Sequence, residues 1–228
     1  MTLKGISSMA TRHVLAELAD AFQQQSGHGV SIESVGGVEA ARRVLAGEAL
    51  DFVVLAADAF DPLEAAGRVV PGSRIGVARS GVAVAVVAGG AHPDIANEAA
   101  VRQAVLHARS IGYSTGPSGV HLTRLFERWG IAKEIEPRMV KAPPGVAVGS
   151  LVARGEAELG FQQLSELIHE QGIELAGPLP PEIQAVTTFS GAVCAASTLP
   201  ETAREFLSYL ASSDTDPVKW RHGMEPAR

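Results

Sequence analysis

The sequence predicts an α/β protein of two lobes that are joined by two long strands. Three observations predict this fold class. Short apolar runs alternate with helix-period stripes over the first part of the chain, a long Val/Ala run begins at Gly81, and a second long apolar run begins at Ala185. Because the two long runs bracket the middle third of the chain, we expect the chain to cross into a second lobe and return over a two-stranded hinge.

The first lobe is predicted from a βαβαβ order of elements. A helical stripe from Val14 to Phe22 ends at Ser26 and Gly27, and DFVVLA, which begins at Asp51, has the composition of a buried strand. This order predicts a parallel sheet with helices on both faces. The expected strands are 3–7, 30–35 and 51–56, and the expected helices are 14–26 and 38–46.

The second lobe and the return to the first follow the same reasoning. The run GVAVAVVAG predicts one hinge strand near 81–89, and AVTTFSGAVCAAS predicts the other near 185–193. The first lobe is then expected to hold residues 1–80 and 192–228, and the second lobe residues 81–191. Between and after the hinge strands, we expect helices 97–107, 117–129, 149–154, 165–171 and 200–211 and strands 110–113 and 158–163.

Composition and charge exclude several classes of protein. The formal net charge is −6 over 228 residues and Lys and Arg are not clustered, which argues against nucleic acid as a partner. The longest apolar run, Val82 to Ala88, is too short to span a bilayer, so no stable membrane insertion is expected. The single cysteine, Cys194, lies in an apolar run and is expected to be a buried thiol.

The N-terminal residues indicate the cellular compartment in which the protein is expected. They contain no basic segment, long apolar segment or small-residue cleavage site, which predicts a cytoplasmic protein. A chain that begins at a mature start with a new Met1 would have the same sequence and would be periplasmic, so both compartments stay open.

One stretch, YSTGPSGVHLTRLFERWGI from Tyr113 to Ile131, predicts an anion site. Small hydroxyl residues and glycines come directly before an amphipathic helix that starts near Pro117 or Ser118. Unpaired N–H groups and a partial positive charge at a helix start favour a bound anion. The alternative is an ordinary strand-to-helix turn.

The sequence lacks the motifs of metal sites, of serine hydrolases and of nucleotide-binding proteins. The sequence has no His, Cys and Asp cluster at metal-ligand spacing, no G-x-S-x-G turn and no phosphate-binding or dinucleotide-binding glycine motif. We therefore expect no metal and no cofactor.

Several motifs in their order resemble one family. SSMATRHVLAELADAF, EAARRVLAGEALDFVVLAAD, ARSGVAVAVVAG, VGSLVARGEAELGFQQLSELI and GPLPPEIQAVTTFSGAV, together with the stretch above, resemble the molybdate-type extracellular solute-binding proteins, including their aconitate-isomerase-like members. The resemblance covers essentially the whole chain. It implies the type II periplasmic-binding-protein fold (Venus flytrap), a small anion held between the lobes and, for an exported protein, the permease of an ABC transporter as partner.

The resemblance also implies which loops bind the anion, namely one after the first strand, one before the second helix, one after the strand that ends in Ala-Asp, and loops of the second lobe. The ligand-binding candidates are Ser7, Ser8, Thr11, Arg12, Gly36, Gly37, Val38, Ala57, Arg79, Ser80, Ser114, Thr115, Pro117, Ser118, Gly119, Val148, Gln162 and Gln163.

Departures from the molybdate pattern favour a carboxylate ligand. Gly36-Gly37-Val38 stands where molybdate binders have a serine-rich turn, and Gln162-Gln163 stands where they have a tyrosine. Arg12 and Arg79 could each offer a planar fork that matches a carboxylate. Strand alternation allows only one of the two glutamines to face the ligand. We expect a di- or tricarboxylate rather than molybdate.

Three functions remain open. The first is a binding protein that closes on a small anion, and the second is an isomerase that moves an allylic proton of a tricarboxylate such as aconitate. For the enzyme, His13 and His121 are the candidate proton-transfer residues, although both could be surface histidines. Asp58 is expected to cap the helix that begins near Asp61. The third function is a cytosolic ligand-sensing protein, for which no DNA-binding segment is present.

Overall fold

The chain divides into two compact units. The computed structural model describes residues 1–143 and 145–228, and unit 1 holds Met1–Arg79 and Thr187–Arg228 while unit 2 holds Ser80–Val186. The chain passes from unit 1 to unit 2 inside strand β4 (Ile75–Val87) and returns at the start of strand β9 (Val186–Val193). Strand β4 begins earlier than the predicted strand, because its first residues pair within unit 1.

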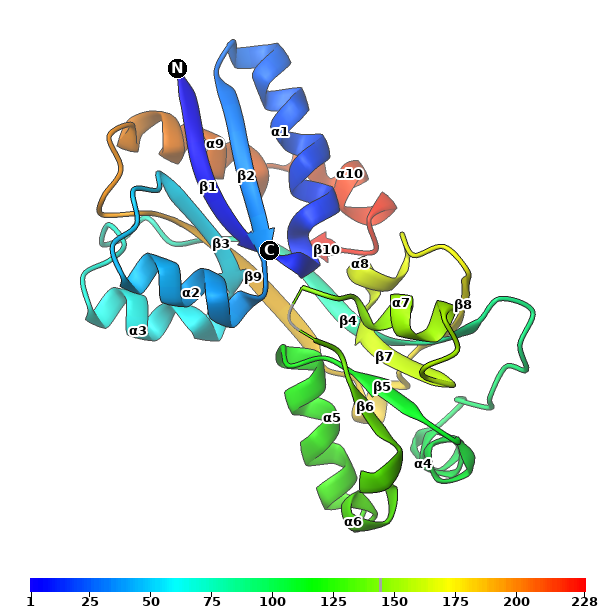
Figure 1. Cartoon of the computed structure of the whole chain (residues 1–228). Helices are drawn as coiled ribbons and strands as arrows, with labels where there is room; N and C mark the ends of the chain where they lie inside the picture. Colours follow the sequence, from blue (N-terminus) through cyan, green and yellow to red (C-terminus); the bar gives the residue numbers. More distant parts are fainter. Residues whose placement is uncertain (144) are drawn as a thin grey trace. The chain divides into compact units, whose positions relative to one another are not determined.

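Unit 1 is built on a sheet with the order β2-β1-β3-β9-β4 (Figure 1). Strand β1 is parallel to both β2 and β3, which confirms the parallel βαβαβ start, whereas β9 is antiparallel to β3. The elements are β1 (Thr2–Ser8), η1 (Met9–Thr11), α1 (Arg12–Ser26), β2 (Gly29–Val35), α2 (Gly37–Leu45), β3 (Phe52–Ala56), η2 (Ala57–Ala59), α3 (Phe60–Ala65), α9 (Pro200–Ala211), η5 (Ser213–Thr215), α10 (Asp216–Arg221) and β10 (Glu225–Pro226).

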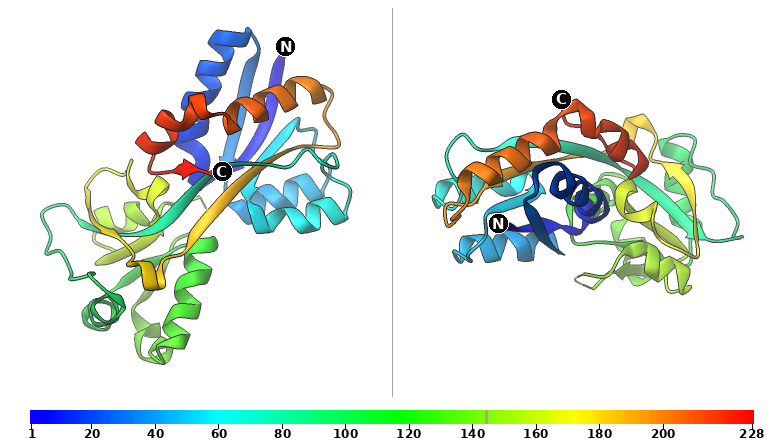
Figure 2. Two further views of the ribbon diagram at one scale, coloured as in Figure 1. Left: turned by 180° about the vertical axis from the view of Figure 1, so that it is seen from behind. Right: turned by 90° about the horizontal axis from the view of Figure 1, so that it is seen from above.

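Strand β3 shows why helices cover both faces of this sheet. All five of its residues are buried and alternate between two cores: Phe52 and Val54 pack with α1 and α9, and Val53 and Leu55 pack with α2 and α3. Seen from behind and from above, α9 crosses the face of the sheet opposite α2 (Figure 2). A Cβ at Gly5 would lie 2.1 Å from the Phe52 ring, so the close packing of β1 on β3 requires glycine there.

Unit 2 has the sheet order β4-β7-β5-β6, with β8 also paired to β4. Along β4, Val82, Val84 and Val86 pack with α4 and α5, whereas Ala83 and Ala85 pack with α8. The elements are α4 (Glu98–His107), β5 (Ile111–Tyr113), α5 (Pro117–Arg128), α6 (Ala132–Ile135), η3 (Glu136–Arg138), β6 (Met139–Lys141), α7 (Val148–Ala153), β7 (Leu159–Gln163), α8 (Leu164–Leu167), β8 (Ile173–Pro178) and η4 (Pro181–Ile183).

One predicted helix is mostly absent. Residues 165–171 were expected to form a helix, but α8 ends at Leu167. Leu167 is buried whereas Ile168 is 40% exposed, so a longer helix would bury no further apolar side chain. Gly172, at a φ of 80°, then turns the chain into β8, a strand that the sequence did not predict.

No helix in residues 1–143 or 145–228 combines the length and the apolar composition that a membrane span needs.

Candidate functional site

The loop after β1 places a buried hydroxyl at the start of α1. Ser7 and Thr11 are buried, and their hydroxyls are engaged: Ser7 Oγ lies 2.9 Å from Ser34 Oγ, and Thr11 Oγ1 donates to the Ser8 carbonyl at 3.0 Å. Ser8 is also buried, but its Oγ has no hydrogen-bond partner among the described residues. An unpaired buried hydroxyl costs free energy unless a ligand or water satisfies it, so Ser8 Oγ is the clearest ligand group of this loop.

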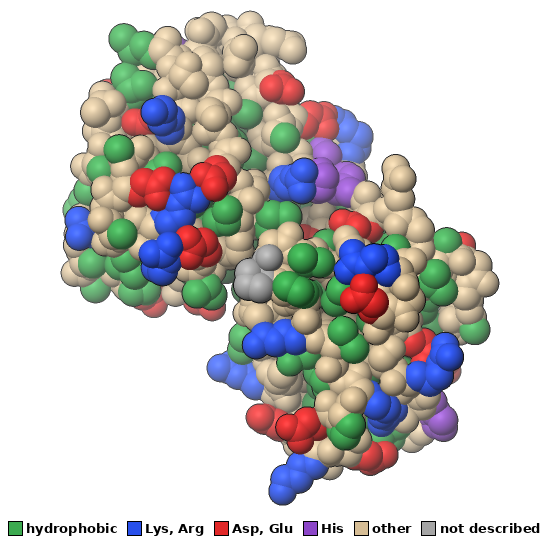
Figure 3. All heavy atoms as spheres, in the orientation of Figure 1, with side chains coloured by type: hydrophobic (Ala, Val, Ile, Leu, Met, Phe, Trp, Pro, Cys, Tyr) green, Lys and Arg blue, Asp and Glu red, His purple; other side chains and the backbone are tan. Residues whose placement is uncertain are grey.

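Arg12 is the first residue of α1, four residues after Ser8. It is exposed, and its guanidinium forms no ion pair or hydrogen bond with any residue that the structure describes, whereas its backbone N–H donates to the Met9 carbonyl. Other arginines of unit 1 are engaged: Arg42 pairs with Glu39 at 2.6 Å, and Arg43 pairs with Glu33 and Glu48. These pairs gather over α2, where both charge signs lie together in Figure 3. Arg12 therefore keeps its guanidinium available for an anion.

The start of α2 lies beside Ser8. A Cβ built on Gly37 would lie 3.8 Å from the Ser8 Cβ, and no side chain caps this helix within the described chain. Gly36 and Gly37 both have negative φ, so these glycines are not explained by a left-handed backbone. Val38 is 77% exposed, and its N–H is one of the unpaired groups of the first turn. Ser8 Oγ and the first N–H groups of α2 thus form a local donor set in unit 1.

The loop after β3 holds Ala57 and Asp58, and both are part of a 3-10 turn. Ala57 lies in the turn η2, and its carbonyl accepts a hydrogen bond from Arg74 at 2.5 Å. Asp58 does not cap α3: it belongs to the same turn, and no side chain caps this helix in the part of the chain that the structure describes. The expectation for Asp58 was therefore wrong, because the chain forms a 3-10 turn before α3 instead of a single capped start.

Arg79 and Ser80 occupy the point where β4 leaves unit 1. The Arg79 guanidinium pairs with Glu225 at 3.0 Å, so part of its fork is already used within unit 1. In unit 2, the Ser80 hydroxyl accepts the Ser165 N–H at 3.3 Å and so ties β4 to α8.

In unit 2, the Ser114 to Gly119 loop has the predicted form at the start of α5. Ser114 Oγ lies 3.2 Å from Ser118 Oγ and accepts the Gly116 N–H at 3.3 Å. Thr115 and Pro117 are exposed, and no side chain caps the first N–H groups of α5 within the described residues. The Ser114 hydroxyl is used within the turn, as the alternative of an ordinary turn expects. In the described part of the chain, no capping side chain accepts the N–H groups of the first turn of α5.

The remaining loops of unit 2 meet at Gln162. Its Oε1 accepts the Val148 N–H at 2.7 Å, and its Nε2 donates to Glu166 Oε1 at 2.8 Å. Gln162 therefore holds the start of α7, and the Val148 N–H has a protein acceptor already. Gln163 is also buried and, by strand alternation, projects from the other face of β7.

Glu166 is a functional candidate that the sequence analysis missed. Burial raises the pKa of its carboxyl group to about 7, the Gln162 amide opposes this shift, and the negative charge of Glu170 adds to it. The Glu170 carboxylate accepts a hydrogen bond from Ser150 Oγ at 2.9 Å. A signal was present in the sequence, because Glu166 follows two consecutive glutamines by three residues, but local periodicity does not show that its carboxyl group is buried.

The two candidate histidines are engaged in packing contacts. His121 Nε2 donates to the Ile183 carbonyl at 2.8 Å, which ties α5 to η4. The His13 ring stacks on His222 with 6.5 Å between centroids, and His222 Nε2 lies 2.7 Å from Glu17. His121 Nε2 is therefore used within unit 2, and the His13 ring lies against another ring of unit 1.

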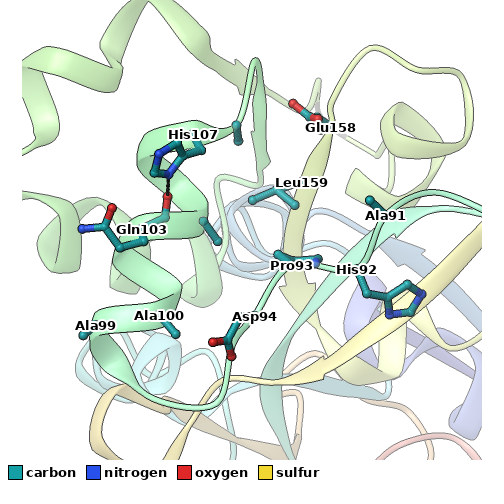
Figure 4. Close-up of a pocket in the computed structure, with 12 residues that line it drawn as sticks. Ala91, His92, Pro93, Asp94, Ala99, Ala100, Gln103, His107, Glu158 and Leu159 are labelled. Atoms are coloured by element: carbon teal, nitrogen blue, oxygen red, sulfur yellow. Dashed lines mark hydrogen bonds between the residues drawn. The ribbon is translucent and has the colours of Figure 1, made fainter.

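A cavity of about 510 Å³ lies elsewhere in unit 2, beside α4 (Figure 4). Its polar side chains include His92, Asp94, His107 and Glu158, and His92 is paired with Glu174 at 2.9 Å. None of the candidate residues lines this cavity.

Two further expectations concern metals and the cysteine. In the described residues, no group of three or more His, Cys, Asp or Glu side chains is arranged to hold a metal ion. Cys194 is buried, which confirms that expectation, and burial raises the pKa of its thiol to about 12.

Comparisons with known proteins identify the family. Residues 3–225 match the model of the bacterial extracellular solute-binding proteins. The chain is 39% identical over 233 residues to an aconitate isomerase from a Pseudomonas species, a match that covers 99% of this chain and 88% of that protein.

Solved structures agree on the fold. The periplasmic molybdate-binding protein of Azotobacter vinelandii is 21% identical, with a TM-score of 0.83, and the match covers 99% of this chain and 100% of that one. The sulfate-binding protein of Mycobacterium tuberculosis is 16% identical, with a TM-score of 0.77. That match covers 100% of this chain and 87% of the sulfate-binding protein. These likenesses confirm the type II periplasmic-binding-protein fold. The chain belongs to the bacterial extracellular solute-binding protein family.

Proposed function

We propose that this protein binds a small unsaturated tricarboxylate of the aconitate type and isomerises it by moving an allylic proton. The proposal rests first on the donor set of unit 1, in which the buried Ser8 Oγ has no partner among the described residues and lies beside the start of α2. A hydroxyl and helix N–H groups favour an anion, and the unpaired Arg12 adds a planar fork that a carboxylate matches better than a tetrahedral oxyanion does.

The choice of tricarboxylate is supported by the ligand groups together with the relative. In unit 1, Ser8, Arg12 and the start of α2 are separate donors, which suits a ligand with more than one carboxylate. The relative that is 39% identical over nearly the whole chain is an aconitate isomerase, whereas the molybdate-binding protein of Azotobacter vinelandii is 21% identical.

Chemistry at carbon also needs a group that titrates near neutral pH. Among the described residues, Glu166 in α8 is such a carboxyl group, because burial raises its pKa to about 7. His121 Nε2 is bonded to the Ile183 carbonyl, and the His13 ring stacks on His222. This observation favours isomerisation over binding alone.

The experiment is proton NMR of the purified protein with trans-aconitate, and separately with cis-aconitate, in deuterated buffer at pH 7. We expect interconversion of the two isomers and incorporation of solvent deuterium into the ligand. Calorimetry with citrate, molybdate and sulfate in the same buffer measures selectivity. Tight binding of molybdate without any turnover of aconitate would refute the proposal.

The second candidate function is solute binding without turnover, and the family itself favours it. A binder of this kind would pass a small carboxylate to the permease of an ABC transporter, and it would be a periplasmic protein. Thermal stabilisation by aconitate or citrate, with no deuterium incorporation, would select this function.

A further inference from the structure

We propose that Glu166 is the proton-transfer residue of the isomerisation, taking the allylic proton from one carbon of the ligand and returning it to another. This inference rests on the proposed function and deepens it. Its starting point is the geometry at the end of β7, where the Glu166 and Gln162 side chains and the Val148 N–H form a chain of hydrogen bonds.

Glu166 is held by one hydrogen bond. Its Oε1 accepts from Gln162 Nε2 at 2.8 Å, and Gln162 Oε1 accepts from the Val148 N–H at 2.7 Å. Glu166 is therefore separated by one side chain from the start of α7. Within residues 1–143 and 145–228, the Gln162 amide is the one hydrogen-bond donor to the Glu166 carboxyl group, so Oε2 accepts no hydrogen bond there. One oxygen orients the carboxyl group, and the other remains for the ligand.

The charges around Glu166 suit both directions of proton transfer. No cation pairs with it in the described chain, and the only charged group that acts on it is Glu170, whose own carboxylate is bonded to Ser150. Burial and the like charge of Glu170 raise the pKa of Glu166 to about 7, which brings its titration into the range where a carboxyl group can both accept and donate a proton.

The allylic proton shift requires no oxidant or reductant, because the proton that leaves one carbon is returned to another. Glu166 Oε2 takes a proton from the methylene carbon next to the double bond, and the C–H electron pair becomes the new C=C bond. The electron pair of the former double bond moves to the far carbon, which takes the proton back from the carboxylic acid. The ligand is isomerised, and Glu166 returns to its starting ionisation state.

The neutral variant Glu166→Gln separates proton transfer from positioning. Its amide can still accept the Gln162 hydrogen bond, but it cannot carry a proton. We expect turnover to fall at least about 100-fold, with loss of deuterium incorporation, while the Kd for trans-aconitate changes less than about threefold. Glu174→Gln is the matched control, because Glu174 pairs with His92 on the surface of the same unit and should keep wild-type turnover.

Two further variants distinguish a loss of proton transfer from a loss of folding. Glu166→Asp keeps a carboxyl group and should keep measurable turnover. Glu170→Gln removes the neighbouring negative charge, so the acid limb of the pH profile of kcat/KM should move to lower pH. Circular dichroism compares the folding of all the variants.

The outcomes distinguish the two proposals. A wild-type protein without turnover overturns the proposed function and this inference with it. An active wild type with a Glu166→Gln variant that keeps more than half of its turnover leaves the proposed function in place and overturns only the role of Glu166.

Discussion

Substitution of Gly119 by alanine tests how closely the start of α5 packs against the 114–116 loop. A Cβ at this position would lie 1.7 Å from the Ser114 carbonyl oxygen and 2.7 Å from its carbonyl carbon, whereas real Cβ contacts essentially never fall below 3.0 Å. The obstacle is backbone, so no side-chain rotation can relieve it. Gly119→Ala must move the 114–116 loop or α5 itself by about 1.5 Å, and we expect it to lower the free energy of unfolding by about 3 kcal/mol.

The measurement is thermal unfolding followed by circular dichroism. For a chain of this size a loss of about 3 kcal/mol corresponds to a fall in Tm of about 6–12 °C. Gly116→Ala is the matched control in the same loop: its Cβ would lie 3.7 Å from Ser114 Oγ, an ordinary contact, and its backbone is extended. A Gly119→Ala variant within about 1 kcal/mol of Gly116→Ala would refute the packing argument.

Three other predictions concern the site and the buried thiol. Arg12→Ala should weaken trans-aconitate binding by about 2 kcal/mol, measured by calorimetry, whereas Arg42→Ala should not, since Arg42 is already paired with Glu39. An unchanged affinity would remove Arg12 from the site. Ser8→Ala should cost about 1 kcal/mol of binding but no stability, because Ser8 Oγ makes no hydrogen bond in the described protein; a lower Tm would contradict this. Cys194 should resist alkylation at pH 8 until the protein unfolds, since burial raises its pKa to about 12, and labelling of the native protein would show that the thiol is accessible.

Much of the fold could be predicted because its signals are local. Helix α9 has the predicted bounds, Pro200–Ala211, although α10 and β10 follow it, and the buried run after Asp51 is strand β3. Strand β6, with three residues, and strand β8 lack a recognisable alternation and form by pairing with β5 and β4. Such pairing depends on residues far away in the sequence, which local periodicity does not contain.

The site was harder to predict than the fold, because burial and hydrogen bonding decide what a side chain can do. Ser7, Ser8 and Thr11 are similar in the sequence, yet only the Ser8 hydroxyl lacks a protein partner in the described part of the chain. His121 suits proton transfer by type, but its Nε2 is bonded to a backbone carbonyl. Glu166 was not singled out in the sequence, and its role depends on its burial and on its hydrogen bond to Gln162, which local periodicity does not contain.

The contacts of Gln162 explain how a binding fold could also hold a group for chemistry. In this chain the Val148 N–H is bonded to Gln162, so the start of α7 offers one donor fewer to an anion. Under the proposed function, the donors of unit 1, namely Ser8, Arg12 and the uncapped start of α2, then contribute a larger share of the anion binding. The Gln162 amide that takes the Val148 N–H also orients Glu166. Gln162→Ala should therefore lower turnover much more than affinity, because it releases the orientation of the carboxyl group and returns the Val148 N–H to the ligand. A parallel loss of affinity and turnover would show that Gln162 serves binding instead.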